Sequence, residues 1–341
     1  MRFFVFIPHF ISKEEIMKRI VSLLLALLMC LVLVTGCGKG KEEGNKPLSP
    51  ESTYPQEYVT YMDMKITVNA EPQKVIAANT NVADQLYAMG LGDRIIGVCY
   101  KNSLINPKYQ AEYDKARIIN EKAATLEQLV AEEPDFVYGR SSAFSEKNGT
   151  THDILTSYGI ASLSSIEGYK LGADVEDVYT DFEILGKIFN KQERAQEIID
   201  EMKAKIASVE EAVKDKEVVK VFVYDATRDE GAYTCGNNFT AKLIRHAGGV
   251  NIFEDMEKTW AVVSWESVID ANPDVIIIND YGSETLEHKI EMLKSTPALQ
   301  SITAVKEGNI VSVTLCECFA SSMTADTVEK FAKACHPDCF Q

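Results

Sequence analysis

The chain begins with a strongly apolar stretch that ends abruptly before a cysteine. Apolar residues run almost unbroken from Ile20 to Val34, directly after the basic pair Lys18 and Arg19. A membrane-spanning helix needs about 20 apolar residues, so this run is short for a span. A basic start, an apolar middle and a small-residue end are typical of a secretory signal peptide, which we predict over residues 1–36. Met17 directly precedes the basic pair and is an alternative start of the natural chain.

The tetrapeptide VTGC that follows resembles the bacterial lipobox, in which the cysteine becomes the lipidated first residue of the mature chain. The resemblance implies a lipid anchor on Cys37, and the alternative is a cleaved signal followed by an incidental cysteine. Acyl chains hold a protein on a membrane by burying methylene groups. The next residues are polar and have no apolar face, so residues 37–57 are predicted to be a lipidated cysteine and a flexible tether.

Apolar strands begin to alternate with helical patterns after Lys74. Residues 75–78 form a short apolar stretch, residues 84–89 have helical spacing, and residues 95–99 form a second apolar stretch. Gly90, just after the helical stretch, can take the left-handed conformation that ends a helix. This strand–helix–strand order predicts a parallel sheet.

One pattern occurs twice in the chain. The segments TLEQLVAEEPDFVYG (125–139) and SWESVIDANPDVIIIND (264–280) each contain a glutamate, a helical stretch, a Pro-Asp pair and an apolar strand. The residue before a proline is disfavoured in a helix, so each proline marks a helix end. The strand after it is apolar without alternation, as expected for a strand covered on both faces. The repeat predicts two lobes of similar construction.

The region between the two copies has the pattern of helices. Residues 175–189 carry apolar residues at helical spacing, and residues 191–215 contain neither proline nor glycine. Asn190 and Glu193 have the spacing of a capping box at the start of the second helix. About 24 residues at 1.5 Å each span about 36 Å, which is enough to join two lobes. One stripe of this helix is apolar: Ala195, Ile198, Ile199, Met202, Ile206, Val209 and Val213.

These patterns predict three parts after the tether. They are an N-terminal lobe over 58–175, a helical region with a linker helix over 176–216, and a C-terminal lobe over 217–341. Ligands of open α/β sheets bind outside the carboxyl ends of the strands. The residues that follow the predicted strands are Thr80, Asn81, Tyr100, Arg140 and Ser141 in the first lobe, and Tyr224, Asp225, Asp280, Tyr281, Cys316 and Glu317 in the second.

The charge of the chain excludes some partners. The formal net charge is -16, and no run of basic residues is present. We therefore expect no nucleic acid as a partner and no broad contact with anionic lipid. Any membrane attachment would come from the lipid anchor alone.

The cysteines and histidines leave the redox state open and disfavour a bare metal ion as ligand. Beyond Cys37 the cysteines are Cys99, Cys235, Cys316, Cys318, Cys335 and Cys339. The last four have no standard zinc spacing, and disulfides, free thiols and a metal or cluster site all remain open. His152, His246, His288 and His336 are scattered along the chain, which disfavours a zinc or manganese site. We predict no resident metal and no cofactor.

An enzyme is the alternative from another class of function. A two-lobed α/β enzyme could hold a metal or Fe–S cofactor with the late cysteines. However, the sequence contains no P-loop, no GxGxxG and no GxSxG. We therefore predict no enzyme activity and no catalytic residue. A ligand-sensing lipoprotein without a permease is a third interpretation.

The chain resembles the class III periplasmic binding proteins, the substrate receptors of ABC importers for ferric siderophores, haem and vitamin B12. The resemblance covers about residues 74–340 and rests on the order and spacing of several segments. They are KVIAANTNVADQLYAMGLGDRIIGV, TLEQLVAEEPDFVYG, GNNFTAKLIRHAGGVNIF, TWAVVSWESVIDANPDVIII and the terminal HPDCF. It implies an α/β fold of two Rossmann-like lobes with parallel sheets, joined by one long helix, with a ligand cleft between the lobes.

The resemblance also implies residue roles. Trp260 and Tyr100 fall near ligand-packing aromatics of the vitamin B12 receptors, and Glu127 and Glu266 match glutamates that dock to arginines of the permease dimer. The chain departs from the vitamin B12 pattern at Glu121 and at Gly139, where that pattern has tryptophans. Together with the strand-end rule, this predicts a ligand site of Asn81, Tyr100, Arg140, Tyr224, Trp260 and Tyr281.

Arg140 would face the cleft and pair with acidic oxygens of a chelate, the alternative being a surface salt bridge. With few arginines available, a mild ferric chelate fits better than a highly charged catecholate. We predict a monomeric receptor, lipid-anchored on the outer face of the cell membrane, that delivers a ferric siderophore or similar iron chelate to a permease dimer. A corrinoid or haem is the alternative ligand.

Overall fold

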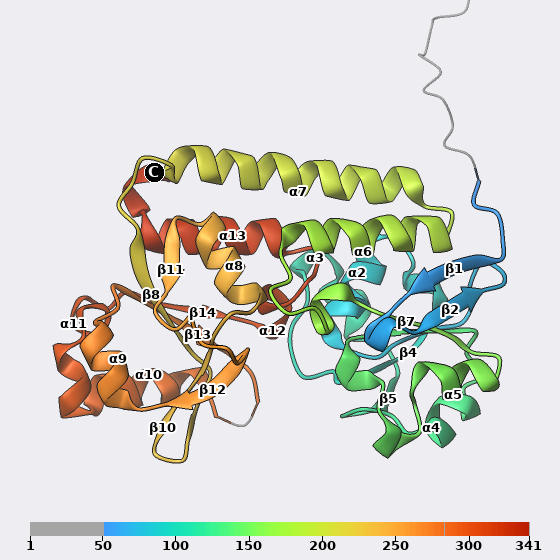
Figure 1. The fold of residues 1–341 in the computed structure, drawn as a ribbon, viewed down its shortest axis with the longest axis horizontal. Coiled ribbons are helices and arrows are strands. Elements are labelled where there is room, and N and C mark those ends of the chain that lie inside the picture. Colours follow the sequence, from blue (N-terminus) through green and yellow to red (C-terminus); the bar gives the residue numbers. More distant parts are fainter. Residues whose placement is uncertain (1–50, 283, 341) are drawn as a thin grey trace, which may run out of the picture. The chain divides into compact units, whose positions relative to one another are not determined.

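The computed structural model describes residues 51–282 and 284–340. The predicted signal peptide, Cys37 and most of the predicted tether lie outside the described residues. The described chain forms two lobes, each built on a parallel sheet, and a long helix that packs on both (Figure 1). The predicted fold class is therefore confirmed.

The N-terminal lobe is built on a five-stranded parallel sheet in the order β5-β4-β3-β6-β7. All three residues of its central strand are buried, because helices cover both faces. Its strands are β3 (Val75–Ala77), β4 (Ile95–Cys99), β5 (Ile118–Asn120), β6 (Phe136–Gly139) and β7 (Ala161–Ser164). Its helices are α2 (Thr80–Ala88), α3 (Pro107–Tyr113), α4 (Leu126–Ala131) and α5 (His152–Ser157).

An antiparallel hairpin precedes this sheet and packs on its last strand. It consists of β1 (Gln56–Val59) and β2 (Lys65–Val68), and β2 contacts β7. The end of the predicted tether is therefore corrected. The Ser52 amide donates to Asn190 Oδ1 at 2.7 Å, and the Tyr54 hydroxyl donates to the Ile188 carbonyl. These bonds hold the chain on the lobe from residue 52 onward.

The C-terminal lobe has a four-stranded parallel sheet in the order β11-β8-β13-β14 and a three-stranded antiparallel sheet in the order β12-β10-β9. The parallel strands are β8 (Val219–Tyr224), β11 (Gly249–Asn251), β13 (Val275–Asn279) and β14 (Ile310–Val313). The antiparallel strands are β9 (Ala226–Arg228), β10 (Gly231–Cys235) and β12 (Trp260–Val263). The helices are α8 (Phe239–His246), α9 (Trp265–Ala271), α10 (Leu286–Ser295), α11 (Thr303–Glu307), α12 (Leu315–Cys318) and α13 (Thr324–Cys335).

Two consecutive helices connect the lobes. The first, α6 (Val175–Ile188), is followed by the 22-residue helix α7 (Gln192–Val213). One part of α7 packs on α6 and another on α13, which lie below it in Figure 1. Its buried residues are the predicted stripe: Ala195, Ile198, Ile199, Met202, Ile206, Val209 and Val213. The predicted linker helix is confirmed.

The predicted capping box at Asn190 is wrong. Asn190 has a left-handed backbone (φ 51°), and the Lys191 amide donates to the Gly186 carbonyl at 2.8 Å. This is the Schellman arrangement that ends a helix, and asparagine tolerates the left-handed conformation it requires. Asn190 therefore closes α6 and does not start α7.

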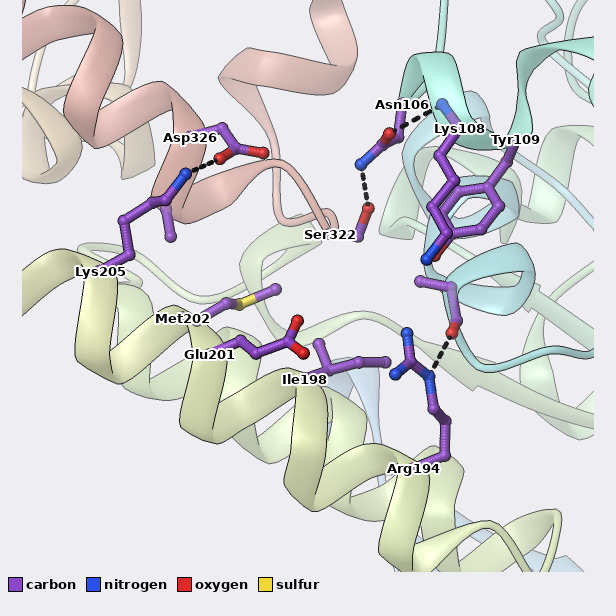
Figure 2. A pocket seen from close by; sticks show the side chains of 12 residues that line it. Asn106, Lys108, Tyr109, Arg194, Ile198, Glu201, Met202, Lys205, Ser322 and Asp326 are labelled. Atoms are coloured by element: carbon purple, nitrogen blue, oxygen red, sulfur yellow. Dashed lines mark hydrogen bonds and ion pairs between the residues drawn. The ribbon is translucent and has the colours of Figure 1, made fainter.

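A second connection between the lobes comes from the stretch between β14 and α13, which we name the crossing segment (314–323). The Ala320 carbonyl accepts hydrogen bonds from the side-chain amides of Asn81 and Gln85, both at 2.9 Å. The Ser322 amide donates to Asp84 Oδ1 at 2.7 Å. Figure 2 shows Asn106 reaching the Ser322 hydroxyl near α7. The crossing segment therefore ties the C-terminal lobe to α2 through buried hydrogen bonds.

Candidate functional site

Two neighbouring cavities lie between the lobes at the carboxyl ends of the parallel strands. The larger chamber has a volume of about 390 Å³. It is lined from the N-terminal lobe by Tyr61, Arg140, Ser141, Glu167 and residues 168–172, and from the C-terminal lobe by Asn238, Phe239, Thr259, Trp260, Cys318 and Phe319. Aromatic side chains from both lobes face one volume, so this chamber suits a ligand with apolar surface.

The smaller chamber has a volume of about 220 Å³ and a different chemical character. Its lining side chains are mostly amides and hydroxyls: Asn79, Thr80, Asn81, Tyr100, Asn102, Ser142 and Tyr281, with Arg140, Leu315 and Phe319. These groups donate and accept hydrogen bonds without adding charge. A polar, uncharged part of a ligand fits this chamber.

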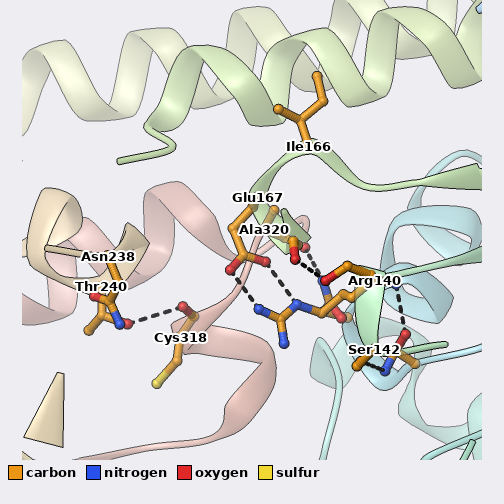
Figure 3. Close-up of polar contacts among 12 residues, drawn as sticks. Arg140, Ser142, Ile166, Glu167, Asn238, Thr240, Cys318 and Ala320 are labelled. Carbon is orange, nitrogen blue, oxygen red and sulfur yellow. Dashed lines mark hydrogen bonds and ion pairs between the residues drawn. The ribbon is translucent and has the colours of Figure 1, made fainter. Parts of the chain in front are cut away.

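Arg140 and Phe319 line both chambers and separate them. The guanidinium carbon of Arg140 lies 3.8 Å from the centre of the Phe319 ring, which is within the range of a cation–π contact. The Arg140 Nε and Nη2 atoms donate to the carboxylate of Glu167 at 3.1 and 2.9 Å (Figure 3). The bidentate pair compensates the charge of Arg140 inside the cleft.

A close backbone approach brings Glu167 to Arg140. A methyl group added at Gly168 would lie 2.9 Å from Arg140 Cβ and 3.1 Å from the Ser141 amide nitrogen. The Ser141 hydroxyl donates to the Gly168 carbonyl in the same contact. Glycine at position 168 therefore allows the loop after β7 to lie against the loop after β6.

Trp260 is supported on one side by other side chains. Its ring stacks on that of Tyr233 with centres 5.6 Å apart and planes at 24°. The guanidinium of Arg228 lies 3.7 Å from the centre of the Tyr233 ring. The stack fixes the orientation of the indole, which also lines the larger chamber. A preformed aromatic wall binds a flat ligand surface at little entropic cost.

Tyr281 is held at the wall of the smaller chamber by a buried polar cluster. Its hydroxyl donates to Asp225 Oδ2, and the Asn279 side-chain amide donates to Asp225 Oδ1, both at 2.8 Å. The Lys289 Nζ atom donates to the carbonyls of Asp225 and Asn279 at 2.6 Å. Burial raises the pKa of Tyr281, with the neighbouring Asp225 carboxylate adding to the effect, so its hydroxyl stays protonated and keeps its hydrogen bond to Asp225.

Five of the six predicted ligand-site residues line the two chambers. Asn81, Tyr100 and Tyr281 line the smaller one, Trp260 lines the larger one, and Arg140 lines both. Asn81 is almost fully buried, and its amide nitrogen is already bonded to Ala320. Whether these five residues bind the ligand stays a prediction.

Tyr224 lies elsewhere, and its predicted place in the site is corrected. Its side chain is fully buried in the core of the C-terminal lobe, where its ring packs on Phe222 and Trp265. Its hydroxyl is bonded to the Thr227 hydroxyl at 2.7 Å. Successive side chains of a strand point to opposite faces, so Tyr224 lies on the same face of β8 as Phe222, and this face packs in the core of the lobe.

The described cysteines are all free thiols, which removes the disulfide alternative for them. Burial raises the pKa of Cys99 to about 11 and that of Cys335 to about 12, so these thiols are protonated at neutral pH. Cys318, which lines the larger chamber, donates to Asn279 Oδ1 at 3.2 Å. In the part of the chain that the structure describes, no group of three His, Cys, Asp or Glu side chains could hold a metal ion.

Three of the four described histidines have structural partners away from the cleft, and the fourth is exposed. His152 is buried between the hydroxyls of Ser162 and Ser164, and His246 lies between Asp174 and Glu210. His336 contacts the Gly248 carbonyl, and His288 is exposed on α10. None of the four lines either chamber.

Glu127 and Glu266 occupy equivalent positions in the two lobes. Each is the second residue of a helix, α4 or α9, after the capping residues Thr125 and Ser264. Both are exposed, and neither takes part in any ion pair found among residues 51–282 and 284–340. They form a pair of accessible carboxylates, and their docking role stays a prediction.

Several cleft residues could not be recognised from the sequence. Tyr61 stands in a polar region without a strand pattern, and Glu167 and Gly168 follow a strand, β7, that was not recognised. Phe239 lies in the segment GNNFTAKLIRHAGGVNIF, which supported the resemblance without giving this residue a role, and Phe319 lies in a short segment without a motif. The only available signal for Phe239 and Phe319 was that they are aromatic residues near the ends of predicted strands or helices.

Two parallel-sheet lobes, a long helix packed on both, and a ligand-sized cleft at the strand ends define a substrate-binding protein of an ABC transporter. The chain belongs to the periplasmic binding protein family, whose model matches residues 75–314.

Three known proteins illustrate the relationship. An uncharacterized ABC transporter substrate-binding lipoprotein, YvrC of Bacillus subtilis, is 23% identical over 95% of this chain and 100% of its own length. A cobalamin-binding protein of Halobacterium salinarum is 24% identical over 73% of this chain, which spans only 65% of that protein. The crystal structure of a periplasmic binding protein from Veillonella parvula superposes with a TM-score of 0.75, is 30% identical, and covers 83% of this chain and 97% of its own.

The family is one of periplasmic binding proteins, and YvrC is named as a substrate-binding lipoprotein of an ABC transporter. Within the described residues, no helix is both long enough and apolar enough to cross a membrane.

Proposed function

We propose that this substrate-binding protein captures a ferric siderophore or a similar iron chelate of low net charge and delivers it to a membrane permease. The charge balance of the cleft carries the proposal. Arg140 is paired with Glu167, and the Lys170 ammonium lies 2.7 Å from Asp177. No charged side chain that lines the two chambers is without such a partner in the described structure. A highly charged ligand would have to break these pairs, whereas a neutral ferric chelate would not.

A corrinoid is the second candidate, because one relative is named as a cobalamin-binding protein. Cobalamin with a bound cyanide also has no net charge. However, Gly139 has no room for the tryptophan of the vitamin B12 pattern, since an added methyl group would lie 2.8 Å from Ala143 Cβ and 3.0 Å from Ala78 Cβ. Glu121 is exposed and lines neither chamber. A corrinoid would need aromatic contacts other than those two.

Binding is tested by titrating the full-length protein with ferrichrome, cyanocobalamin, haemin and a trianionic ferric tricatecholate while following tryptophan fluorescence. Trp260 and Trp265 are the only tryptophans of the chain. Trp260 lines the larger chamber, whereas Trp265 packs on Phe222 and Tyr224 in the core. We expect saturable quenching by ferrichrome that is lost in Trp260→Phe and kept in Trp265→Phe.

The outcomes separate the candidates. Saturation by cyanocobalamin alone would select the corrinoid, and preferential binding of the tricatecholate would contradict the charge argument. Silence across the panel, with the protein shown to be folded, would reject the proposed ligand class and leave the family assignment in place.

We further propose that Cys37 carries the lipid anchor and that Glu127 and Glu266 dock to the permease. The equivalent, exposed positions of Glu127 and Glu266 on the two lobes support a pair of contacts with a dimeric partner. Exposed charges of this kind set orientation and encounter rate more than affinity. We expect Glu127→Ala combined with Glu266→Ala to lower chelate uptake by cells while leaving ligand affinity unchanged.

Glu287 provides a matched control for docking, because it is the exposed second residue of α10. Glu287→Ala should leave uptake unchanged. Equal uptake by the double variant and the parent protein would reject the docking role. Metabolic labelling with a fatty acid, compared between the parent protein and Cys37→Ala, tests the anchor.

A further inference from the structure

We propose that the turn of the N-terminal hairpin, Tyr61–Asp63, is a clamp that holds an uncharged, apolar face of the ligand in the larger chamber. The inference rests on the proposed function of the cleft and makes it more specific. It assigns ligand contact to a segment that precedes the first strand of the N-terminal sheet and that was not recognised as part of the site from the sequence.

The turn has an unusual backbone that its surroundings hold in place. Met62 and Asp63 both have left-handed conformations, with φ of 59° and 55°. Bulky side chains rarely adopt this region, and residues held there are enriched at ligand clamps. The Thr60 amide donates to the Met64 carbonyl at 2.9 Å, and the buried Thr60 hydroxyl accepts from the Ser164 amide at 2.8 Å. The turn is therefore anchored to the end of β7.

One side chain of the turn, that of Tyr61, extends the aromatic wall of the larger chamber. Tyr61 lines this chamber, and its ring lies 5.9 Å from that of Tyr169, which lines it as well. Leu171 also lines the chamber, although 62% of its surface is exposed. Met62 is 74% exposed, the largest value among the exposed large apolar side chains of the described chain. Met62 follows Tyr61 directly in the chain and does not itself line the chamber. Exposed apolar side chains beside a cleft are unfavourable in water unless something covers them.

The opposite wall has matching chemistry. Phe239 and Trp260 line the chamber from the C-terminal lobe, so apolar side chains of both lobes would contact one bound group. The charged side chains of this chamber are Arg140, Glu167 and Lys170, and each is already in an ion pair. A ligand group that enters between the turn and Trp260 would therefore gain most from being broad, apolar and uncharged.

Variants of the turn test the clamp in the full-length protein. Tyr61→Ala removes the ring, Tyr61→Phe restores it, and Met62→Gly removes the thioether while supplying a residue that tolerates left-handed φ. Tyr158→Ala is the matched control, since Tyr158 is 58% exposed and lines neither chamber. Each protein is titrated with ferrichrome, cyanocobalamin, haemin and the ferric tricatecholate, and its Tm is recorded.

We expect Tyr61→Ala to weaken binding of the best probe by about tenfold or more, as truncation of an aromatic anchor does at other binding sites. Tyr61→Phe should restore the affinity, and Tyr158→Ala should not change it. Met62→Gly should weaken binding while its Tm stays equal or rises. A turn with only a structural role would not separate affinity from stability in this way.

The outcomes distinguish the two levels of inference. If a probe binds the parent protein and binds Tyr61→Ala and Met62→Gly equally well, the clamp is wrong and the receptor function stands. If the best probe is the trianionic tricatecholate, the uncharged face is wrong. If no probe binds the parent protein, the proposed ligand class fails and the clamp fails with it.

Discussion

At the scale of single residues, Arg140 is the centre of the cleft. It stacks on Phe319 of the other lobe, pairs with Glu167, and donates from its backbone amide to Asn79 Oδ1 at 2.7 Å. The Glu167 side chain is only 6% exposed, and Arg140 holds its carboxylate with two hydrogen bonds. Arg140 therefore serves the stability of the cleft as well as any ligand contact.

Replacing Arg140 by alanine should destabilise the fold. The change leaves the Glu167 carboxylate buried without its partner, and losing one member of a buried pair costs about 3–5 kcal/mol. Because 23% of the Arg140 side chain is exposed, we expect the lower end of that range. Urea unfolding measures the change. Arg228→Ala, which removes an arginine from an exposed aromatic contact, should cost about 1 kcal/mol or less.

The compound variant Arg140→Ala with Glu167→Gln identifies the cause. It should recover part of the loss, because the neutral amide is cheaper to bury than an unpaired carboxylate. If the single variant is as stable as the parent protein, the ion pair contributes no net stability, and the charge argument for a neutral ligand loses its main support.

Replacing Gly168 by alanine should disturb the same place through sterics alone. The new methyl group would lie 2.9 Å from Arg140 Cβ and 3.0 Å from its Cα atom, so the two loops must separate. Forcing extra volume into a packed site costs about 1–3 kcal/mol. We expect lower thermal stability and weaker binding of any ligand that contacts Arg140. Unchanged binding by calorimetry would show that the loops adapt without moving the guanidinium.

Apart from Trp260, which the family resemblance indicated, the residues of the site were predictable only where they follow the end of a strand. Tyr100 directly follows β4, and Tyr281 is the second residue after β13; both line the cleft, as the strand-end rule requires. Tyr224 is the last residue of β8, and the direction of that side chain depends on the pleat of the strand, which a sequence of buried residues without alternation does not reveal. The place of Glu167 in the site depends on a contact between two loops, and such a contact leaves no pattern in the local sequence.

At the scale of elements, His246 joins three helices. It is the last residue of α8, and its ring nitrogens bond to Asp174, the capping residue of α6, at 2.8 Å and to Glu210 of α7 at 2.6 Å. The bond to Asp174 is the main cause that raises the pKa of His246 to about 9, and the bond to Glu210 adds to it. The imidazolium is therefore the form that holds the helices together.

Replacing His246 by glutamine should lower stability in a pH-dependent way. A histidine whose pKa is higher in the folded state stabilises fully below its unfolded value of about 6.5, and this stabilisation is lost as the pH rises through about 9. The difference in unfolding free energy between parent and variant should be largest near pH 6 and shrink toward pH 10.

Chemical denaturation across this pH range measures the effect, with His288→Gln as an exposed control on α10. A constant difference between pH 6 and pH 10 would show that His246 contributes through packing and not through its charge.

The helices were predicted better than the short strands. The buried stripe of α7 follows the helical period over 22 residues, and other kinds of secondary structure rarely give such a pattern in the sequence. The strands β1 and β2 have only four residues each and lie among polar residues, so their pairing was not visible. The start of α7 was misplaced because Asn190 has capping chemistry that suits either side of a helix boundary.

At the scale of the whole described chain, two connections limit how far the lobes can separate. The helix α7 packs on both lobes, and the crossing segment is hydrogen-bonded to α2 through Ala320 and Ser322. Figure 2 shows the neighbouring ion pair between Lys205 of α7 and Asp326 of α13. Opening the cleft widely would expose these polar groups and break their bonds.

Ligand binding should therefore change the lobe arrangement little. We expect small-angle scattering curves of the ligand-free and ligand-saturated protein to superimpose. The variant Asn81→Ala with Gln85→Ala removes both donors to Ala320, and its ligand-free curve should indicate wider separation of the lobes. A clear decrease in radius of gyration of the parent protein on binding would contradict this prediction.

The crossing segment also has a consequence for how the protein is made. Synthesis proceeds toward the carboxyl terminus. Asn81, Asp84 and Gln85 of α2 are therefore synthesised long before Ala320 and Ser322, which provide their hydrogen-bond partners. Buried polar groups without partners disfavour the folded state. The N-terminal lobe should consequently stay loose on the ribosome until almost the entire chain has been translated.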